Sequence, residues 1–440
     1  MRILSITAGA AGMYCGSCAR DNALAVDLMA RGCEVTLVPV YTPTRTDEPN
    51  VSNRRVLFGG ISVYLQQHVP LFRHTPRFLD RLWDAPSVID AFAGRSVSHD
   101  PRLLGDLTVS MLRGEQGVLR KEFAKLLDWL RAEPMPDIVN LPNSLLIGLA
   151  APLGRALKRP VCCTLQGEEQ FIHGLPEPYQ RQAVELIRRQ VQHVDRFIAV
   201  SEFCARYMGD YLAIPSDKMA VVPLGIHLNG YERRQPSTAP DAEFRVGFFA
   251  RVAPEKGLRE LADAYIRFRQ RTGPARTRLE AAGYLAARHR DYLSRVHRAL
   301  EEAGFANEFT YRGELDRAGK QAYLRSLDVL SVPAPYDEPK GIFLLEAMAA
   351  GVPVVQPRRG AFIEIIEKTG GGLLVEADNP DALADALFRL WQDREKAEAL
   401  GQSGFQGVRT HYSAAHSASR LLEVYEEVLR SYEVAGSFKA

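Results

Sequence analysis

Short β-rich runs alternate with helical runs along this chain, and the alternation occurs twice. In the first half, the β-rich runs lie at residues 2–6, 34–39, 137–141, 161–165, 196–200 and 219–223. In the second half, they lie at residues 245–250, 279–283, 309–312, 329–332, 353–356 and 372–375. Strands that alternate with helices form parallel sheets, because each return to the sheet needs a long crossover. The sequence therefore predicts an α/β fold with two doubly wound parallel-sheet domains.

The expected domain boundaries follow from composition shifts. Residues 227–243 contain the polar run RRQPSTAPDAE and are interpreted as a linker between domains at 1–226 and 244–412. A long insertion at about residues 41–136 interrupts the first domain, and insertions of this size usually shape a ligand site. A final helix is expected within residues 413–440, where it could pack on either domain.

Composition and charge exclude several classes of protein. The 440 residues carry a formal net charge of +2, so no excess of positive charge suggests a nucleic-acid partner. No apolar run reaches the roughly 18 residues of a membrane span. Six cysteines are too few for a disulfide scaffold, and we expect a reduced, cytoplasmic protein. Cys15 and Cys18 form a C-x-x-C pair, for which redox chemistry or half a zinc site stays an alternative, but no metal is expected.

The segment YDEPKGIFLLEAMAAGVPVV combines two carboxylates with a helix start. Glu338 lies in the loop before the expected helix, and Glu346 lies inside the helix. The first N–H groups of a helix lack partners within it and attract anions such as phosphate. Here these groups would belong to Gly341, Ile342 and Phe343. The alternative is that both glutamates only favour the first half of an ordinary α/β helix.

A second segment, FFARVAPEKGL, places two basic residues after the first strand of the second domain. Arg251 and Lys256 then lie at the carboxyl end of that strand, where open α/β sheets bind ligands. A guanidinium and an ammonium together suit a diphosphate. The alternative is a solvated basic loop in which Lys256 pairs with Glu255. Combined with a helix start and a carboxylate for ribose hydroxyls, the pair favours a nucleoside diphosphate ligand.

These two motifs, F-F-A-R-V-x-x-E-K-G and E-P-K-G-I-F-L-L-E-A-M-A-A-G-V-P-V-V, resemble those of the retaining glycosyltransferases of family 4. The runs ARGCEV and VVPLGI resemble further segments of the same family. The resemblance implies the GT-B fold, with two Rossmann-like domains facing across a cleft and the last helix crossing back to the first domain. It also implies a hexosyltransferase that uses a nucleotide-diphosphate sugar.

The resemblance assigns roles residue by residue. Arg251 and Lys256 would bind the donor diphosphate and stabilise the leaving group. Glu346 would hold the ribose hydroxyls, and Glu338 would lie beside the donor sugar. Further expected donor-binding positions are the amides of Gly341, Ile342 and Phe343, the first-domain loop at Gly16, and, less specifically, Glu364.

The sequence departs from the family pattern at Gln166, which replaces a histidine that touches the donor sugar. Gln166 can form the same hydrogen bond, but it cannot titrate near neutral pH. The acceptor is a carbohydrate or small molecule that the sequence does not identify. Tyr14, Arg20 and the insertion, which includes His68, are the expected acceptor-side surface. His173 is a further acceptor candidate, and both histidines are more often structural.

The expected reaction follows from the charges. Breaking the bond between the sugar and the diphosphate leaves negative charge on the diphosphate, which fixed cations stabilise. The resemblance implies attack on the same face of the sugar, without a protein nucleophile and without a metal or other cofactor. The donor nucleotide stays open among UDP, GDP and ADP. Contact with a membrane surface stays compatible with the sequence.

Other functions stay open. A nucleotide-sugar epimerase shares this architecture but needs acid and base residues that the sequence does not offer. A pyridoxal-dependent phosphorylase would need a suitably placed lysine, and neither Lys256 nor Lys340 fits. A NAD dehydrogenase would need G-x-G-x-x-G, whereas this chain has Gly12-x3-Gly16. A non-catalytic protein that binds nucleotide sugars is the remaining alternative.

Overall fold

The chain forms two compact units in the computed structural model, Met1–Pro223 with Ser417–Ala440 and Leu224–His416. The structure describes residues 1–9, 16–44, 46, 49–53, 56, 58, 101–235 and 242–437. Tyr14, Cys15 and His68 lie outside these residues, as does most of the central part of the expected insertion.

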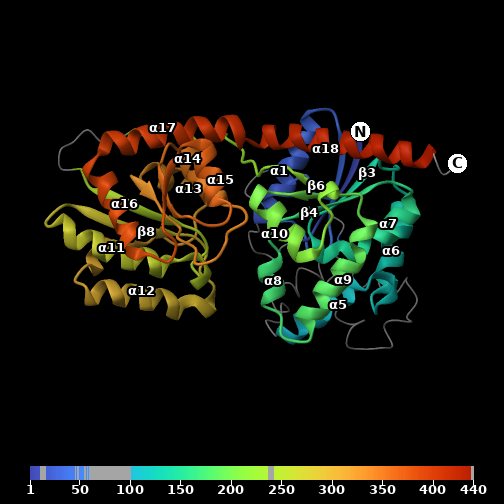
Figure 1. The fold of residues 1–440 in the computed structure, drawn as a ribbon, viewed down its shortest axis with the longest axis horizontal. Helices are drawn as coiled ribbons and strands as arrows, with labels where there is room; N and C mark the ends of the chain where they lie inside the picture. The colour runs from blue at the N-terminus through green and yellow to red at the C-terminus, as the bar shows by residue number, and fades with distance from the viewer. Residues whose placement is uncertain are drawn as a thin grey trace. The chain divides into compact units, whose positions relative to one another are not determined.

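The first unit contains a parallel six-stranded sheet with the order β2-β1-β3-β4-β5-β6. Strands β3, β4 and β6 of this sheet are labelled in Figure 1. Its strands are β1 (Arg2–Thr7), β2 (Glu34–Pro39), β3 (Ile138–Leu141), β4 (Val161–Leu165), β5 (Arg196–Ala199) and β6 (Met219–Val221). Its helices are α1 (Gly16–Ala30), α5 (Pro101–Leu112), α6 (Arg120–Leu130), α7 (Ala150–Leu157), α8 (Glu169–His173), α9 (Tyr179–Gln190), α10 (Glu202–Leu212) and most of α18 (Ala414–Ser437).

The second unit repeats the plan with the strand order β12-β11-β10-β7-β8-β9. Its strands are β7 (Phe244–Phe249), β8 (Thr277–Ala282), β9 (Phe309–Tyr311), β10 (Val329–Leu330), β11 (Val354–Pro357) and β12 (Gly372–Val375). Its helices are α11 (Leu258–Thr272), α12 (Arg290–Glu302), α13 (Arg317–Arg325), α14 (Ile342–Ala349), α15 (Phe362–Thr369), α16 (Pro380–Gln392) and α17 (Arg394–His411).

Both sheets confirm the predicted fold class. Each strand predicted from the sequence is present, and the observed bounds differ from the predicted ones by at most two residues. The agreement is good because fully buried parallel strands appear in a sequence as continuous apolar runs. For example, every residue of β3, β4 and β11 is buried.

Helix α18 completes the core of the first unit. Its apolar face packs against α1 and the sheet, in a buried cluster that includes Ile3, Leu24, Leu28, Val35, Ile138, Ile198, Leu421, Val424, Tyr425 and Val428. The residues spaced three or four apart along α18 form one stripe, and burial of such a stripe stabilises a helix. The C-terminal helix therefore shares one hydrophobic core with α1 and the sheet of the first unit.

The expected linker is not a free connection over its described part, residues 227–235 and 242–243. Tyr231 is buried, and the Arg234 guanidinium lies 2.7 Å from Asp328 Oδ1. The Arg234 backbone N–H also donates to the carbonyl of Ala350. These contacts attach the segment to the second unit. The Tyr231 side chain therefore packs within that unit, where its hydroxyl reaches Glu346.

Candidate functional site

Two loops of the second unit meet at the carboxyl edge of its sheet. One follows β7 and contains Lys256 and Gly257, and the other follows β10 and contains Pro333. Strands β7 and β10 are neighbours, so their carboxyl ends lie side by side. Gly257 has φ +80°, and a Cβ there would lie 2.1 Å from the Pro333 carbonyl oxygen. Only glycine permits both this backbone conformation and this close approach.

Lys256, Tyr336 and Glu338 form a hydrogen-bonded cluster between these loops. Lys256 Nζ lies 2.5 Å from Glu338 Oε2 and 2.6 Å from the Tyr336 hydroxyl, and this hydroxyl also donates to Glu338 Oε2. The side chains of Lys256 and Glu338 are only 12% and 6% exposed. A charge pair with so little water around it interacts more strongly than an exposed pair.

The backbone holds Glu338 from the other side. Gly360, in the loop after β11, lies so close that a Cβ there would be 2.5 Å from the Glu338 carbonyl oxygen. The N–H of Ala361 donates to that oxygen at 2.8 Å. Burial raises the pKa of the Glu338 carboxyl, but Lys256 and the Tyr336 hydroxyl together lower the pKa below its ordinary value. Glu338 is therefore ionised at neutral pH.

Helix α14 begins beside this cluster. Gly341 is its N-terminal cap, with φ +65°, and it offers no side chain that could accept from the first N–H groups of the helix. Lys256 Nζ lies 5.8 Å from the centre of the Phe343 ring, in the first turn of the helix. The ammonium and the positive end of the helix dipole are thus close together, an arrangement that favours an anion. In this structure the Glu338 carboxylate is the anion that lies beside them.

Glu346 lies further along α14 and has two partners from other elements. Lys320 Nζ of α13 lies 2.8 Å from Glu346 Oε1, and the Tyr231 hydroxyl donates to the same oxygen at 3.1 Å. Glu346 was expected from its motif, whereas Lys320, Tyr231 and Tyr336 were missed. Tyr336 is the first residue of the segment YDEPKGIFLLEAMAAGVPVV, but no role was expected for it. The positions of Lys320 and Tyr231 carry no motif, and only the packing of α13 and of the segment after β6 brings them to this carboxylate.

Arg251 and Glu364 are two further expected donor-binding residues of the second unit. Arg251 has a side chain that is 57% exposed and pairs with Glu255 at 3.4 Å, so Arg251, rather than Lys256, takes the Glu255 partner. Glu364 is in the first turn of α15 and is partly exposed. Burial raises the pKa of Tyr412, and the negative charge of the Glu364 carboxylate raises it further.

In the first unit, Gln166 is buried at the carboxyl end of β4 and is only 4% exposed. Its side-chain nitrogen donates to the Pro142 carbonyl at 2.9 Å, while its buried side-chain oxygen has no partner among the described residues. The Gln166 backbone N–H donates to Glu168 Oε2 at 2.8 Å, and Glu168 Oε1 accepts from the Ser144 N–H at 2.7 Å. The unused acceptor of Gln166 can take a hydroxyl hydrogen from a ligand. Gly16 is the first residue of α1.

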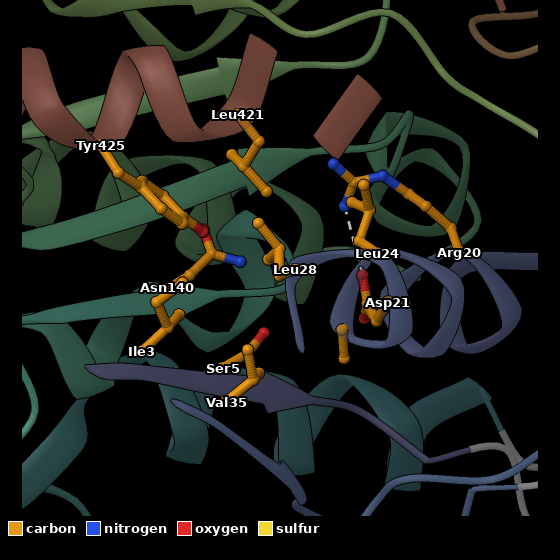
Figure 2. A pocket seen from close by; sticks show the side chains of 11 residues that line it. Ile3, Ser5, Arg20, Asp21, Leu24, Leu28, Val35, Asn140, Leu421 and Tyr425 are labelled. Atoms are coloured by element: carbon orange, nitrogen blue, oxygen red, sulfur yellow. Dashed lines mark hydrogen bonds and ion pairs between the residues drawn. The ribbon is translucent and has the colours of Figure 1, made fainter. Parts of the chain in front are cut away.

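Arg20 is buried rather than on an acceptor-side surface, so that expectation is wrong. It is 6% exposed, and its guanidinium lies 3.2 Å from Asp21 Oδ1. Figure 2 shows this pair beside a small cavity that is also lined by Asn140 and Tyr425. The cavity has a volume of about 10 Å³. It holds one water molecule at most, which is too little for a sugar.

Comparison with known proteins agrees with this architecture. The sequence pattern described as "Glycosyltransferase Family 4" matches residues 22–229, and "Glycosyl transferases group 1" matches residues 231–407. The crystal structure of HepE from Anabaena in complex with UDP and glucose has a TM-score of 0.66 and 18% identity, and the similarity covers 97% of this chain and 100% of that chain.

The class that this fold defines is therefore that of the GT-B glycosyltransferase fold. More particularly, the chain belongs to glycosyltransferase family 4, of the group 1 glycosyl transferases. Within the described ranges, every helix is too short or too polar to traverse a lipid bilayer.

Curated relatives share shorter stretches of sequence. The phosphatidyl-myo-inositol mannosyltransferase of Mycobacterium leprae is 38% identical over 131 residues, which cover 30% of this chain and 35% of the relative. The GDP-mannose-dependent α-(1-6)-phosphatidylinositol monomannoside mannosyltransferase of Mycobacterium tuberculosis is 28% identical over 225 residues, covering 48% of this chain and 56% of the relative. The chain thus spans from about a third to about half of the length of these relatives.

Proposed function

We propose that this glycosyltransferase is a retaining enzyme that moves a sugar from a nucleotide-diphosphate sugar to an acceptor hydroxyl. The observation that carries the proposal is the largely buried Lys256 ammonium beside the start of α14, whose cap is a glycine. Both features attract an anion, and a diphosphate is the anion that a donor of this class presents. The 18% sequence identity with HepE is too low to supply the donor, so the support comes from the geometry of this site.

The same groups suit the chemistry of the transfer. The bond between the anomeric carbon and the diphosphate oxygen breaks, and its electron pair goes to the diphosphate. The acceptor oxygen bonds to the same face of the carbon, and its proton passes to the departing phosphate. Lys256 and the first N–H groups of α14 would stabilise the charge that develops on the leaving group. Glu338 would orient the sugar hydroxyls, and this scheme requires neither a protein nucleophile nor a bound metal.

GDP-mannose is the first donor to test, because one of the relatives is named as GDP-mannose-dependent. Arg251 would join the diphosphate only by exchanging its Glu255 partner for the ligand. Gln166 would accept a hydroxyl hydrogen from the sugar through its unused oxygen. Gly16 and Glu364 stay in the proposed donor site on the strength of the family motifs alone.

A thermal-shift panel tests the proposal. GDP, UDP or ADP, and the matching nucleotide sugar, should raise the melting temperature by linkage, whereas NAD and pyridoxal phosphate should not. Incubation of the responding nucleotide sugar with candidate acceptors should then give a glycoside with the anomeric configuration of the donor, with EDTA present. No response to any of the three nucleoside diphosphates would refute the proposal. A product with inverted configuration would refute the retaining mechanism alone.

A further inference from the structure

The carboxylate of Glu346 is held by two donors from separate parts of the second unit. Lys320 Nζ and the Tyr231 hydroxyl lie 2.8 Å and 3.1 Å from the same atom, Glu346 Oε1. Lys320 is in the first half of α13, and Tyr231 is in the segment that follows β6. The side chains of Lys320 and Glu346 are mostly buried, and so is Tyr231.

This arrangement compensates for the burial of the carboxylate and fixes its orientation. A buried carboxylate is stable in its ionised form only when a cation or several hydrogen bonds compensate for lost water. Lys320 supplies the cation, and Tyr231 supplies a second hydrogen bond to the same oxygen. Because these two donors use the accepting capacity of Oε1, hydroxyl groups of a ligand would be accepted mainly by Oε2.

We propose that Lys320 and Tyr231 are positioning residues that hold the Glu346 carboxylate oriented to accept the hydroxyl groups of a nucleotide ribose. The inference rests on the proposed function, since it takes a ribonucleotide as the ligand. Lys320 and Tyr231 touch the glutamate rather than the ligand in this scheme. Their effect on binding is thus indirect: by orienting the Glu346 carboxylate, they make the site prefer ligands that carry ribose hydroxyls.

A purely structural role for the ion pair has a different consequence. If Lys320 only ties α13 to α14, its loss lowers the stability of the protein and affects all nucleotides alike. If it positions Glu346, its loss weakens only those ligands that have ribose hydroxyls. The ratio of affinities for a ribonucleotide and its dideoxy analogue separates the two roles, because effects on phosphate and base binding cancel in the ratio.

The test measures the affinities of GDP and 2′,3′-dideoxy-GDP, and of UDP and 2′,3′-dideoxy-UDP, by calorimetry on the full chain. The wild type should prefer the ribonucleotide by roughly 10-fold or more, as expected for hydrogen bonds to a charged group. Lys320→Met should reduce this preference to about 2-fold or less and leave the affinity for the dideoxy analogue nearly unchanged. The control Lys396→Met replaces an exposed lysine of α17 and should keep the wild-type ratio.

Two further variants keep the inference testable if Lys320→Met folds poorly. Tyr231→Phe removes one hydroxyl and should lower the preference partly, and Lys320→Arg keeps the charge and should retain most of it. An unchanged ratio in both Lys320→Met and Tyr231→Phe would overturn the inference, as would a wild type that binds GDP or UDP without preferring ribose. A wild type that binds neither nucleotide, nor ADP, would instead refute the proposed function and this inference with it.

Discussion

Lys256 Nζ lies 2.5 Å from Glu338 Oε2, although 82 residues separate the two along the chain. The contact follows from the strand order of the second sheet, in which β7 and β10 are neighbours. Parallel neighbours bring their carboxyl ends to the same edge, and the loops that leave them meet there. The pair is therefore a product of sheet topology, and its position at the start of α14 makes it the centre of the proposed diphosphate site.

Replacing Lys256 by methionine tests the role of its charge. The variant Lys256→Met keeps most of the aliphatic side chain but removes the ammonium that would face the leaving group. We expect kcat/KM to fall by about 100-fold or more, as when a preorganised donor is removed from a developing negative charge. The shift in melting temperature caused by the nucleoside diphosphate should also be lost. Wild-type kinetics in this variant would contradict the proposed role, and Lys396→Met serves as the control for loss of a positive charge.

Gly257 should be intolerant of any side chain. The variant Gly257→Ala combines a left-handed backbone with a Cβ that would lie 2.1 Å from the Pro333 carbonyl oxygen. Gly304, which follows α12, is a matched control, because its φ is +83° but a Cβ added there would meet no atom of the described residues within 4 Å. We expect Gly304→Ala to cost about 1 kcal/mol from backbone strain alone, and Gly257→Ala to cost clearly more. Urea denaturation measures both, and equal costs would show that the two loops separate easily.

The Glu338 ion pair should contribute to stability in a pH-dependent way. Burial raises the pKa of Glu338, but Lys256 and Tyr336 lower it by more, so the folded-state pKa lies below its ordinary value. An unfolded glutamate titrates near about 4.3. The contribution is thus fully present above that pH and is lost as the pH falls through the lower folded-state pKa.

The variant Glu338→Gln measures this contribution. It should be less stable than the wild type by about 2 kcal/mol at pH 7, and the difference should shrink as the pH falls below about 4. Urea denaturation between pH 3 and pH 7 gives the free energy of unfolding of both proteins. A difference that does not change with pH would show that the charge of Glu338 is unimportant for the fold.

Helix α18 should be held to the first unit by its buried stripe. Leu421→Ala removes a side chain that packs in the core cluster with α1, and it should lower the free energy of unfolding by about 2–4 kcal/mol. Leu422→Ala, at the next and only partly buried position, should cost less than half as much. Similar costs for the two variants would contradict the packing of this helix.

The proposed contact between Gln166 and a sugar hydroxyl can be tested by replacing Gln166 with histidine, the residue that the family resemblance leads us to expect at this position. A neutral histidine can donate to the Pro142 carbonyl with one ring nitrogen and accept a hydroxyl hydrogen with the other. Gln166→His should therefore retain activity to within about 3-fold, whereas Gln166→Met, which has no such acceptor, should lose about 10-fold in kcat/KM. Equal activities of these two variants would exclude a sugar contact at Gln166.

Local patterns predicted the elements of this fold well. The apolar runs identified every strand of both sheets to within two residues, and the glycine at position 341 marked the start of α14. These features depend on near neighbours in the chain, since periodicity and backbone freedom are properties of a short segment. Recognition of Lys256, Glu338 and Glu346 as site candidates also came from short motifs.

The partners of those residues depended on the tertiary structure. Sequence patterns did not indicate that Lys256 would pair with Glu338 instead of Glu255, that Arg251 would stay largely in solvent, or that Arg20 would be buried. Nor did they connect Lys320 and Tyr231 with Glu346. Such contacts join segments far apart in the chain, and they exist only once strand order and helix packing have set which loops are neighbours. The sequence alone thus determined the elements and the residue types of the site, whereas packing of the sheet and its helices decided which charges meet.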